Sequence, residues 1–287
     1  MFLKLFTSLL LSLFFALQAQ ALPLTSHKME LSIAIQPQKD YNFTGIVRLS
    51  NCSGSLVRFV SSLPTDKGLV LTNGHCVNLL KPGVVIYHQP VKRMFALLDT
   101  TGQETLGYVN STEILYGTMT NTDMALYSLD STYEEIYNQF KVTPYVLAPG
   151  YVKVGTSIDI LSGFWKKGYS CEVESFVYKL KEDAWTWYDS IRYSRPGCET
   201  IHGTSGSPVI MSGTRYIVAI NNTGNDDGKE CTMDNPCEVD PKGNVFYQKG
   251  FSYAQQTSWV YTCLSQSGAF DLRVSGCILP KPPAKLH

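Results

Sequence analysis

The chain has 287 residues with 24 basic and 24 acidic side chains, so its formal net charge at pH 7 is zero. This balance argues against a nucleic-acid-binding protein, because such proteins normally present a basic face to the phosphates. After the amino-terminal region no apolar run approaches the roughly 20 residues that span a bilayer, so we expect no stable membrane anchor.

Residues 1–21 are typical of a secretory signal peptide. Lys4 precedes an apolar run from Leu5 to Leu17, and Ala19-Gln20-Ala21 has the small-x-small form that signal peptidase cleaves. We therefore expect a soluble protein that is secreted or periplasmic. Residues 22–43 are interpreted as either a propeptide or an ordered amino-terminal extension.

Short β-strands dominate the predicted secondary structure. Runs rich in Val, Ile, Tyr, Phe and Leu recur between turns that contain Gly, Pro, Asn or Asp. Helical periodicity is weak except at Thr132–Phe140 and near Ser258–Leu264. The sequence therefore predicts an all-β sandwich or a pair of β-barrels. Examples of these runs are, in chain order, Ser55–Val60, Lys67–Thr72, Val84–His88, Met124–Leu129, Ile158–Leu161, Trp185–Tyr193 and Tyr216–Asn221.

A turn-rich segment divides the chain into two comparable halves. Pro144 and Pro149-Gly150 interrupt regular structure there and favour a connection that runs over the surface. The domain boundaries that we expect are residues 44–130 for a first β-subdomain, 131–150 for a linker, 151–265 for a second β-subdomain and 266–287 for a carboxyl-terminal tail.

Eight cysteines follow the predicted signal peptide, and an even number in an exported chain usually forms disulfides. None has the CxxC spacing of a zinc site, and we expect no metal there. The acidic stretch Asn222–Gly243 holds two of the cysteines and is interpreted either as a calcium loop or as a solvated loop pinned by a disulfide. The cysteines are Cys52, Cys76, Cys171, Cys198, Cys231, Cys237, Cys263 and Cys277.

A histidine follows an apolar strand in Leu69-Val-Leu-Thr-Asn-Gly-His75-Cys76. Alone, such a histidine is more often a surface or structural residue. Together with the upstream Cys52-Ser-Gly-Ser-Leu-Val, however, the segment resembles the trypsin-like, or chymotrypsin-like, serine protease family, in which two such cysteines form a disulfide behind the catalytic histidine. The resemblance implies a catalytic His75 and a Cys52–Cys76 bond that fixes its turn, where a shift of about 1 Å can be costly to catalysis.

Two further segments carry the same resemblance. Asp123 opens an apolar strand in Asn121-Thr-Asp123-Met-Ala-Leu, as the family's triad aspartate does, although an isolated Asp there is usually a turn residue. Gly203-Thr-Ser205-Gly-Ser-Pro208 resembles the nucleophile loop and is the most specific match. It implies Ser205 as the nucleophile, with Ser207 as a competing hydroxyl at a variable position. The order His, Asp, Ser along the chain is that of the chymotrypsin class.

The family resemblance implies a fold and a mechanism. The fold is two Greek-key, six-stranded β-barrel subdomains packed side by side, with a short carboxyl-terminal helix or tail. Ser205 attacks a peptide carbonyl, His75 accepts its proton, and Asp123 orients the imidazole. The amides of Gly203 and Ser205 bind the oxyanion, and a side chain at position 203 would obstruct them. No cofactor is needed.

The sequence departs from the family pattern at two places. Thr204 stands where trypsin has an aspartate that pairs with a newly cleaved amino terminus, so the usual zymogen switch is removed. Gly45-Ile46-Val47 superficially resembles an activated terminus but lies too close to Cys52 to leave room for an opening strand. In these respects the chain resembles bacterial and glutamyl-endopeptidase relatives.

The resemblance also implies substrate-binding residues. Val218-Ala-Ile-Asn-Asn222-Thr-Gly224 aligns with the family strand that adds the substrate as an extra strand, with Gly224 keeping the pocket mouth open and Asn222 replacing a serine. Glu199 occupies the family position at the base of the primary pocket, where an acid favours Lys or Arg. Alternatively, an insertion moves Glu199 to the rim, and Thr200 and His202 allow a preference for acidic residues.

More than one pairing remains open for the other six cysteines. Cys231–Cys237 closes a small loop and Cys263–Cys277 tethers the tail, which leaves Cys171–Cys198. The alternative is Cys198–Cys231, which matches a family bond beside the pocket. The end of the tail, Leu279-Pro-Lys-Pro-Pro, is expected to be flexible or polyproline-like.

A secreted serine endopeptidase accounts best for these features. We expect it to act as a monomer on protein or peptide substrates, with no nucleic-acid partner. The alternative from another class is a catalytically silent homologue that serves as a binding module, since the fold does not guarantee the activity. An esterase of the α/β-hydrolase type is disfavoured because the chain lacks a Gly-x-Ser-x-Gly elbow followed by the acid and the histidine.

Overall fold

The computed structural model describes residues 39–283. Every strand and helix below lies in the second of the chain's two units, Asp40–His287. The predicted signal peptide and residues 22–38 of the predicted extension lie outside the described residues. Within the described range, no helix has the length and apolar character needed to cross a membrane.

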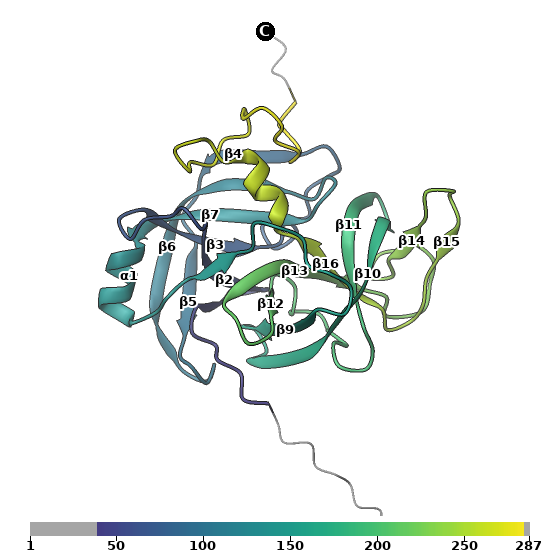
Figure 1. Cartoon of the computed structure of the whole chain (residues 1–287), viewed down its shortest axis with the longest axis horizontal. Helices are drawn as coiled ribbons and strands as arrows, with labels where there is room; N and C mark the ends of the chain where they lie inside the picture. Colours follow the sequence, from purple (N-terminus) through teal and green to yellow (C-terminus); the bar gives the residue numbers. More distant parts are fainter. Residues whose placement is uncertain (1–38, 284–287) are drawn as a thin grey trace, which may run out of the picture. The chain divides into compact units, whose positions relative to one another are not determined.

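The first half of the second unit forms a closed β-barrel (Figure 1). Its strands pair in the order β1-β5-β6-β7-β3-β2, and β2 pairs again with β1 to close the ring. A further strand, β4 (Val85–Pro90), pairs with the second half of β6. The barrel strands are β1 (Ile46–Arg48), β2 (Ser53–Arg58), β3 (Lys67–Thr72), β5 (Met94–Leu98), β6 (Thr105–Thr118) and β7 (Met124–Thr132).

The second half forms another closed barrel with the same connectivity. Its order is β9-β10-β11-β16-β13-β12, and β12 pairs with β9 to close it. In each barrel the third strand pairs with the last rather than with the next, which is the Greek-key arrangement. The predicted fold class, two Greek-key barrels of the chymotrypsin-like type, is confirmed. The strands are β9 (Ser157–Ser162), β10 (Lys167–Glu182), β11 (Trp185–Tyr193), β12 (Pro208–Met211), β13 (Tyr216–Gly224) and β16 (Ser252–Gln256).

The segment between the barrels contains a helix and a short strand. Helix α1 (Tyr133–Phe140) begins at Thr132, whose hydroxyl accepts from the Glu135 amide while the Glu135 carboxylate accepts from the Thr132 amide. This capping box fixes the helix start. Strand β8 (Tyr145–Leu147) pairs in parallel with β2 on one side and β13 on the other, so it joins the sheets of the two barrels.

Strands that face the opposite barrel are buried on both sides. Strand β3 is buried from its second residue to its last, β16 is buried throughout, and six consecutive residues of β13 are buried. A strand that is covered on only one face alternates buried and exposed residues, so these runs mark the seam between the barrels. A small hairpin, β14 (Cys237–Val239) and β15 (Val245–Phe246), pairs with the end of β10.

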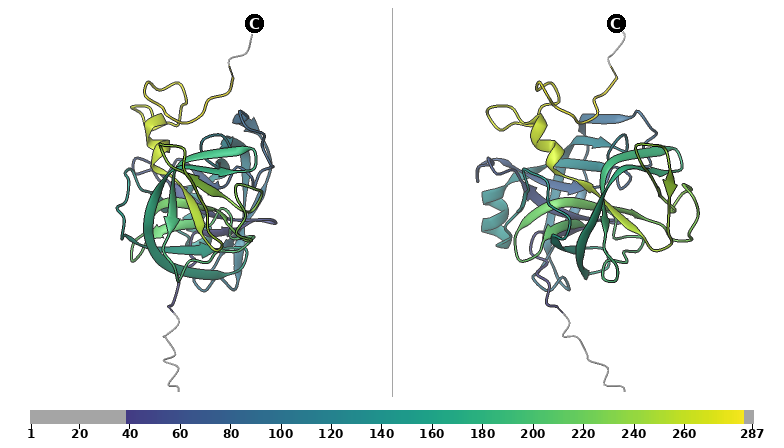
Figure 2. Two further views of the ribbon diagram at one scale, coloured as in Figure 1. Left: turned by 90° about the vertical axis from the view of Figure 1, so that its right-hand side faces the viewer. Right: turned by 45° about the vertical axis from the view of Figure 1, so that its right-hand side comes forward.

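The carboxyl-terminal segment packs against the first barrel (Figure 2). A 3₁₀-helix, η1 (Ser258–Cys263), follows β16. Beyond it Leu279 is only 2% exposed, and the Tyr116 hydroxyl donates to the Pro280 carbonyl over 3.2 Å. The first alternative, a flexible tail, is therefore wrong at Leu279 and Pro280, because an apolar side chain and a hydrogen bond hold them in place, while the polyproline-like alternative stays a prediction.

Most of the quoted strand predictions fall on observed strands. Lys67–Thr72 and Trp185–Tyr193 match β3 and β11 from end to end, and Thr132–Phe140 covers α1 with its cap. One inference is wrong: the chain does have an opening strand before Cys52, because Ile46–Arg48 forms β1. Three residues suffice there, since β1 pairs with both β2 and β5.

Candidate active site

His75 and Asp123 meet at the edge of the first barrel. The Asp123 side chain is fully buried, and its Oδ2 lies 2.6 Å from Nδ1 of His75. The other carboxylate oxygen, Oδ1, accepts from the His75 backbone amide over 3.0 Å. Both carboxylate oxygens therefore bind the same residue, which fixes the position of the loop and the orientation of the ring.

The turn that carries His75 is held close to Asp123 by its own residues. The Asn73 side chain donates to the Asp123 carbonyl over 2.9 Å. At Gly74 a Cβ atom would lie 2.0 Å from the Thr118 carbonyl oxygen, so no larger residue fits between the turn and β6. The disulfide between Cys52 and Cys76 ties the residue after His75 to the start of β2. The turn is thus fixed from three directions.

The electrostatic surroundings favour the protonated form of His75. Burial lowers the pKa of the imidazole, but the charge and the hydrogen bond of Asp123 outweigh burial, so the pKa of His75 lies above its ordinary value of 6.5. The carboxylates of Glu182 and Asp234 act in the same direction more weakly. An imidazole in this setting is a stronger base than a free one.

Ser205 lies on a tight loop that depends on glycine. Gly203 and Gly206 have φ angles of 86° and 79°, in the left-handed region that favours glycine. At Gly203 a Cβ atom would lie 2.8 Å from the Phe164 ring, and at Gly206 it would lie 2.2 Å from the Ser53 carbonyl oxygen. Both glycines are therefore required for the loop to reach this position.

The carbonyl groups of the Ser205 loop are tied to neighbouring elements. The Ser53 amide donates to the Ser205 carbonyl over 2.8 Å, and the Ser53 hydroxyl donates to the Gly203 carbonyl over 3.1 Å. The Trp165 indole donates to the His202 carbonyl. Within the described residues, the amides of Gly203 and Ser205 donate no hydrogen bond. Ser205 lines the cleft, whereas Gly203 is not among the residues that line it.

The hydroxyl of Ser205 donates to the Asn222 carbonyl over 3.3 Å, and the described residues contain no hydrogen bond between Ser205 and His75. Ser205 nevertheless lines the same cleft as His75 and Asp123. The competing hydroxyl, on Ser207, is fully buried and does not line the cleft. The structure therefore favours Ser205 over Ser207 as the accessible hydroxyl.

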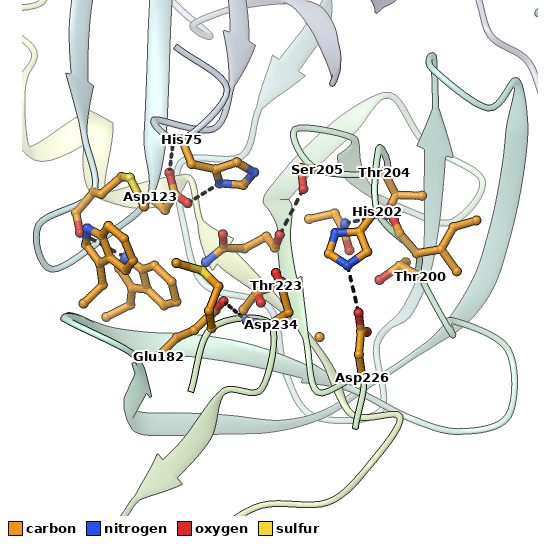
Figure 3. A pocket seen from close by; sticks show the side chains of 18 of the residues that line it. His75, Asp123, Glu182, Thr200, His202, Thr204, Ser205, Thr223, Asp226 and Asp234 are labelled. Carbon is orange, nitrogen blue, oxygen red and sulfur yellow. Dashed lines mark hydrogen bonds and ion pairs between the residues drawn. The ribbon is translucent and has the colours of Figure 1, made fainter. Parts of the chain in front are cut away.

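The cleft lies between the two barrels and has a volume of about 160 Å³ (Figure 3). One side lies beneath His75 and Asp123 and includes Glu182 and Asp234. The other side includes Thr200, His202 and Asp226, where the His202 ring contacts the Asp226 carboxylate at 2.8 Å. The predicted substrate-binding residues Thr200, Asn222 and Gly224 all line the cleft.

A free strand edge borders the cleft at the end of β13. Strand β16 pairs with β13 as far as Gly224, whereas β12 pairs with it only as far as Ile220. Among the described residues, Thr223 and Gly224 therefore have a strand partner on one side only, and Asn222 lies at the β-bulge before them without a partner in the register. An extended peptide can pair with such an edge.

The structure does not place Glu199 in the cleft. Its side chain is exposed and accepts from the Gly197 amide over 3.0 Å, and it is absent from the residues that line the cleft. The predicted position at the base of a pocket is therefore incorrect. An exposed carboxylate keeps its hydration and does not need a substrate cation as a partner, so Glu199 supplies no basis for selecting Lys or Arg.

Four disulfides join all eight cysteines: Cys52–Cys76, Cys171–Cys198, Cys231–Cys237 and Cys263–Cys277. The alternative Cys198–Cys231 bond is not formed, since Cys198 is bonded to Cys171. In the loop Asn222–Gly243, the acidic side chains described do not converge on one point as calcium ligands do. The Cys231–Cys237 disulfide pins this loop, as the second interpretation predicts.

Sequence reasoning missed one wall of the cleft. This wall is the end of the β10–β11 hairpin, which brings Glu182, Trp185 and Trp187 to the cleft. The indoles of Trp185 and Trp187 donate to the carbonyls of Leu80 and Met119 in the first barrel, over 2.8 and 3.1 Å. The segment Lys181-Glu182-Asp183 has the composition of a solvated turn, so no local signal distinguishes it.

No family model and no curated protein sequence matches the chain. Among solved structures, the chain is similar to the MamO protease domain of Magnetospirillum magneticum, with 16% identity, 78% of this chain and 98% of that chain covered, and a TM-score of 0.48. It is also similar to a Glu endopeptidase in complex with MPD (17% identity, 76% and 87% covered, TM-score 0.46). The protease Anisep of Arthrobacter nicotinovorans is a third (15% identity, 75% and 91% covered, TM-score 0.42).

Proposed function

We propose that the chain is a serine endopeptidase in which His75, Asp123 and Ser205 form the catalytic triad. The observation that carries the proposal is the His75–Asp123 pair, whose Nδ1 to Oδ2 distance is 2.6 Å, in the same cleft as a serine on a glycine-flanked loop. A buried carboxylate on Nδ1 leaves Nε2 of a neutral imidazole as the proton acceptor, which is the arrangement that activates a serine.

Catalysis needs one change at Ser205. Its hydroxyl donates to the Asn222 carbonyl over 3.3 Å, and it has to turn towards His75 for proton transfer. Rotation about χ1 exchanges staggered rotamers rapidly, and catalytic hydrogen bonds are often long or misaligned before substrate binds. In the proposed reaction Ser205 attacks the carbonyl, His75 accepts the proton and passes it to the leaving amine, and water then hydrolyses the acyl-enzyme.

The Gly203 and Ser205 amides form the proposed oxyanion hole. Neither has an acceptor in the described part of the chain, while the surrounding carbonyls are bound by Ser53 and Trp165. A donor fixed in advance of the reaction stabilises a developing negative charge without reorganisation, and each such donor is worth about 3 kcal/mol. The role of Ser53 is to hold the loop in the shape that exposes these donors.

The proposed substrates are extended segments of proteins or peptides. The free edge Asn222–Gly224 lies beside Ser205 and offers main-chain groups to a peptide of any sequence. We also propose that the protein is exported, because four disulfides are typical of proteins that fold in an oxidising compartment. We further propose that the protein acts as a monomer.

The test is hydrolysis of a denatured protein, with the cleavage products mapped by mass spectrometry. We expect the wild-type protein to cleave it and Ser205→Ala to be at least about 10⁴-fold slower. Ser207→Ala is the matched control, since Ser207 lies in the same loop but outside the cleft, and it should retain activity. A folded wild-type protein without activity, or a fully active Ser205→Ala variant, would overturn the proposal in favour of a silent homologue or another nucleophile.

A further inference from the structure

Glu182 is a buried acid whose charge has no counter-ion in the described structure. It ends strand β10, is only 5% exposed, and lines the cleft. One carboxylate oxygen, Oε1, accepts from the Asp234 amide over 2.8 Å. The other, Oε2, makes no hydrogen bond of acceptable geometry among the described residues, although the Thr223 hydroxyl lies close enough to favour the charged form of the carboxyl. A buried carboxylate oxygen without a donor is unfavourable, so the site is incomplete without a further donor.

The charges around Glu182 are unbalanced. The other acids that line the cleft are Asp123, which is paired with His75, Asp226, which is paired with His202, and Asp234 beside Glu182. No lysine or arginine is found among the described residues that line the cleft. The side of the cleft that contains Glu182 and Asp234 therefore has an excess of negative charge and attracts a cation.

The walls near Glu182 suit a long side chain with a charged end. Leu79, Met119, Trp185, Trp187 and Met233 line this cleft together with the acids. Lysine and arginine place an apolar stem along such surfaces and a cation at the tip, and an indole face also attracts a guanidinium or ammonium group.

The position of this acid relates it to the substrate strand. In Figure 3, Glu182 and Asp234 lie beside Thr223, on the side of the cleft away from Thr200 and His202. Thr223 belongs to the free edge Asn222–Gly224, where the proposed function places the substrate backbone. Side chains of an extended peptide alternate between its two faces, so a residue paired with this edge can direct its side chain towards Glu182.

We propose that Glu182, supported by Asp234, forms a subsite that selects a lysine or arginine side chain in the substrate segment bound along Asn222–Gly224. This inference rests on the proposed function and names a substrate class for it. The cation would supply the donor that Oε2 lacks. Glu182, which lines the cleft, thus takes the role that the sequence suggested for Glu199.

The preference should depend on pH. Burial raises the pKa of Glu182 to about 7; the Thr223 hydroxyl and the Asp234 amide oppose this rise, the Asp234 carboxylate adds to it, and His75 lowers the pKa. Glu182 is therefore neutral below pH 7 and charged above it, so selection of a cation should strengthen as the pH rises. His75, Asp123 and Asp226 also face the cleft, and their titration affects the wild-type protein and a Glu182→Gln variant alike. The difference between the two pH profiles therefore reports the titration of Glu182.

The test compares peptides that differ only in charge. Alanine-rich octapeptides carry one arginine, moved along the sequence, or its neutral analogue citrulline. At pH 8 we expect kcat/KM to be about tenfold or more higher for arginine at one or two positions, because a hydrogen bond to a charged group has this magnitude. Glu182→Gln should abolish the difference and Glu199→Gln, an exposed glutamate, should preserve it. Equal rates for both peptides, or a preference that persists in Glu182→Gln, would overturn the inference.

A binding measurement separates this inference from the proposed function. The same peptides are titrated into the Ser205→Ala protein, and into Ser205→Ala with Glu182→Gln, by fluorescence anisotropy. Tighter binding of the arginine peptides that is lost with Glu182→Gln supports the subsite even where no hydrolysis occurs. If the wild-type protein hydrolyses the peptides but neither assay shows a preference for arginine, the subsite proposal is wrong and the endopeptidase proposal stands. Thermal unfolding of each variant verifies that it is folded.

Discussion

At the scale of single residues, His75 determines how activity should depend on pH. The neutral imidazole is the proposed base, and Asp123 raises its pKa above 6.5. We therefore expect kcat/KM for an uncharged peptide to be low in acid and to rise with pH through a midpoint above 6.5. In Asp123→Asn the remaining effect of burial lowers the pKa, so the midpoint should move to lower pH while the rate falls about 10⁴-fold.

The measurement is kcat/KM between pH 5 and pH 9 for both proteins, over a range where thermal unfolding shows that each is folded. An uncharged peptide is used so that titration of Glu182 does not alter substrate binding. A profile whose midpoint stays in place in Asp123→Asn would contradict the assignment of Asp123 as the group that controls His75.

The triad candidates came from the sequence through the family resemblance, and only the Ser205 loop has a local physical reason for its pattern. Gly203, Ser205 and Gly206 adjoin in the chain, and the need for glycine arises from backbone angles within this loop. Glu182 and Glu199 could not be told apart in this way. Whether either lines the cleft depends on contacts with residues distant in sequence, such as the bond from Asp234 to Glu182.

At the scale of elements, the β10–β11 hairpin connects the second barrel to the first. Tyr188 of β11 donates its amide to the Asn121 carbonyl over 3.1 Å, close to Asp123. The Trp187 indole donates to the Met119 carbonyl, and both side chains are almost fully buried. The hairpin thus supports the loop before β7 as well as forming a wall of the cleft.

Trp187→Phe tests this contact. The ring remains apolar, but the buried Met119 carbonyl loses its donor, so we expect the free energy of unfolding to fall by about 1–3 kcal/mol. Denaturation in urea measures the change. Trp165→Phe is the control: this indole also donates to a carbonyl, that of His202, but it is exposed, and water can replace the bond. Equal effects of the two substitutions would contradict a docking role for Trp187.

Strand positions could be predicted where short apolar runs end in turn residues, as at β3 and β11. The pairing between elements could not. The end of β10 contains Lys181 and Glu182, a composition that favours solvent, yet Glu182 is buried by the loop that follows β13. A pattern of side chains identifies the faces of a strand but not the distant segment that covers it.

At the scale of the whole molecule, the candidate site is assembled from both barrels. His75 and Asp123 belong to loops of the first barrel, and Ser205 belongs to a loop of the second. Ser53, at the start of β2 in the first barrel, holds the carbonyls of the Ser205 loop, so the two halves are joined at the site itself. The order in which the strands of the two barrels pair could be predicted only from the family resemblance, because strand order does not follow from strand composition.

The central claim is that His75 activates Ser205. The most direct measurement is reaction of the folded, oxidised protein with a fluorophosphonate, followed by mass spectrometry to locate the adduct. We predict one adduct on Ser205, absent in Ser205→Ala, present in Ser207→Ala and formed orders of magnitude more slowly in His75→Ala. No adduct on Ser205 in the folded protein, or equally fast labelling of Ser205 without His75, would contradict the claim.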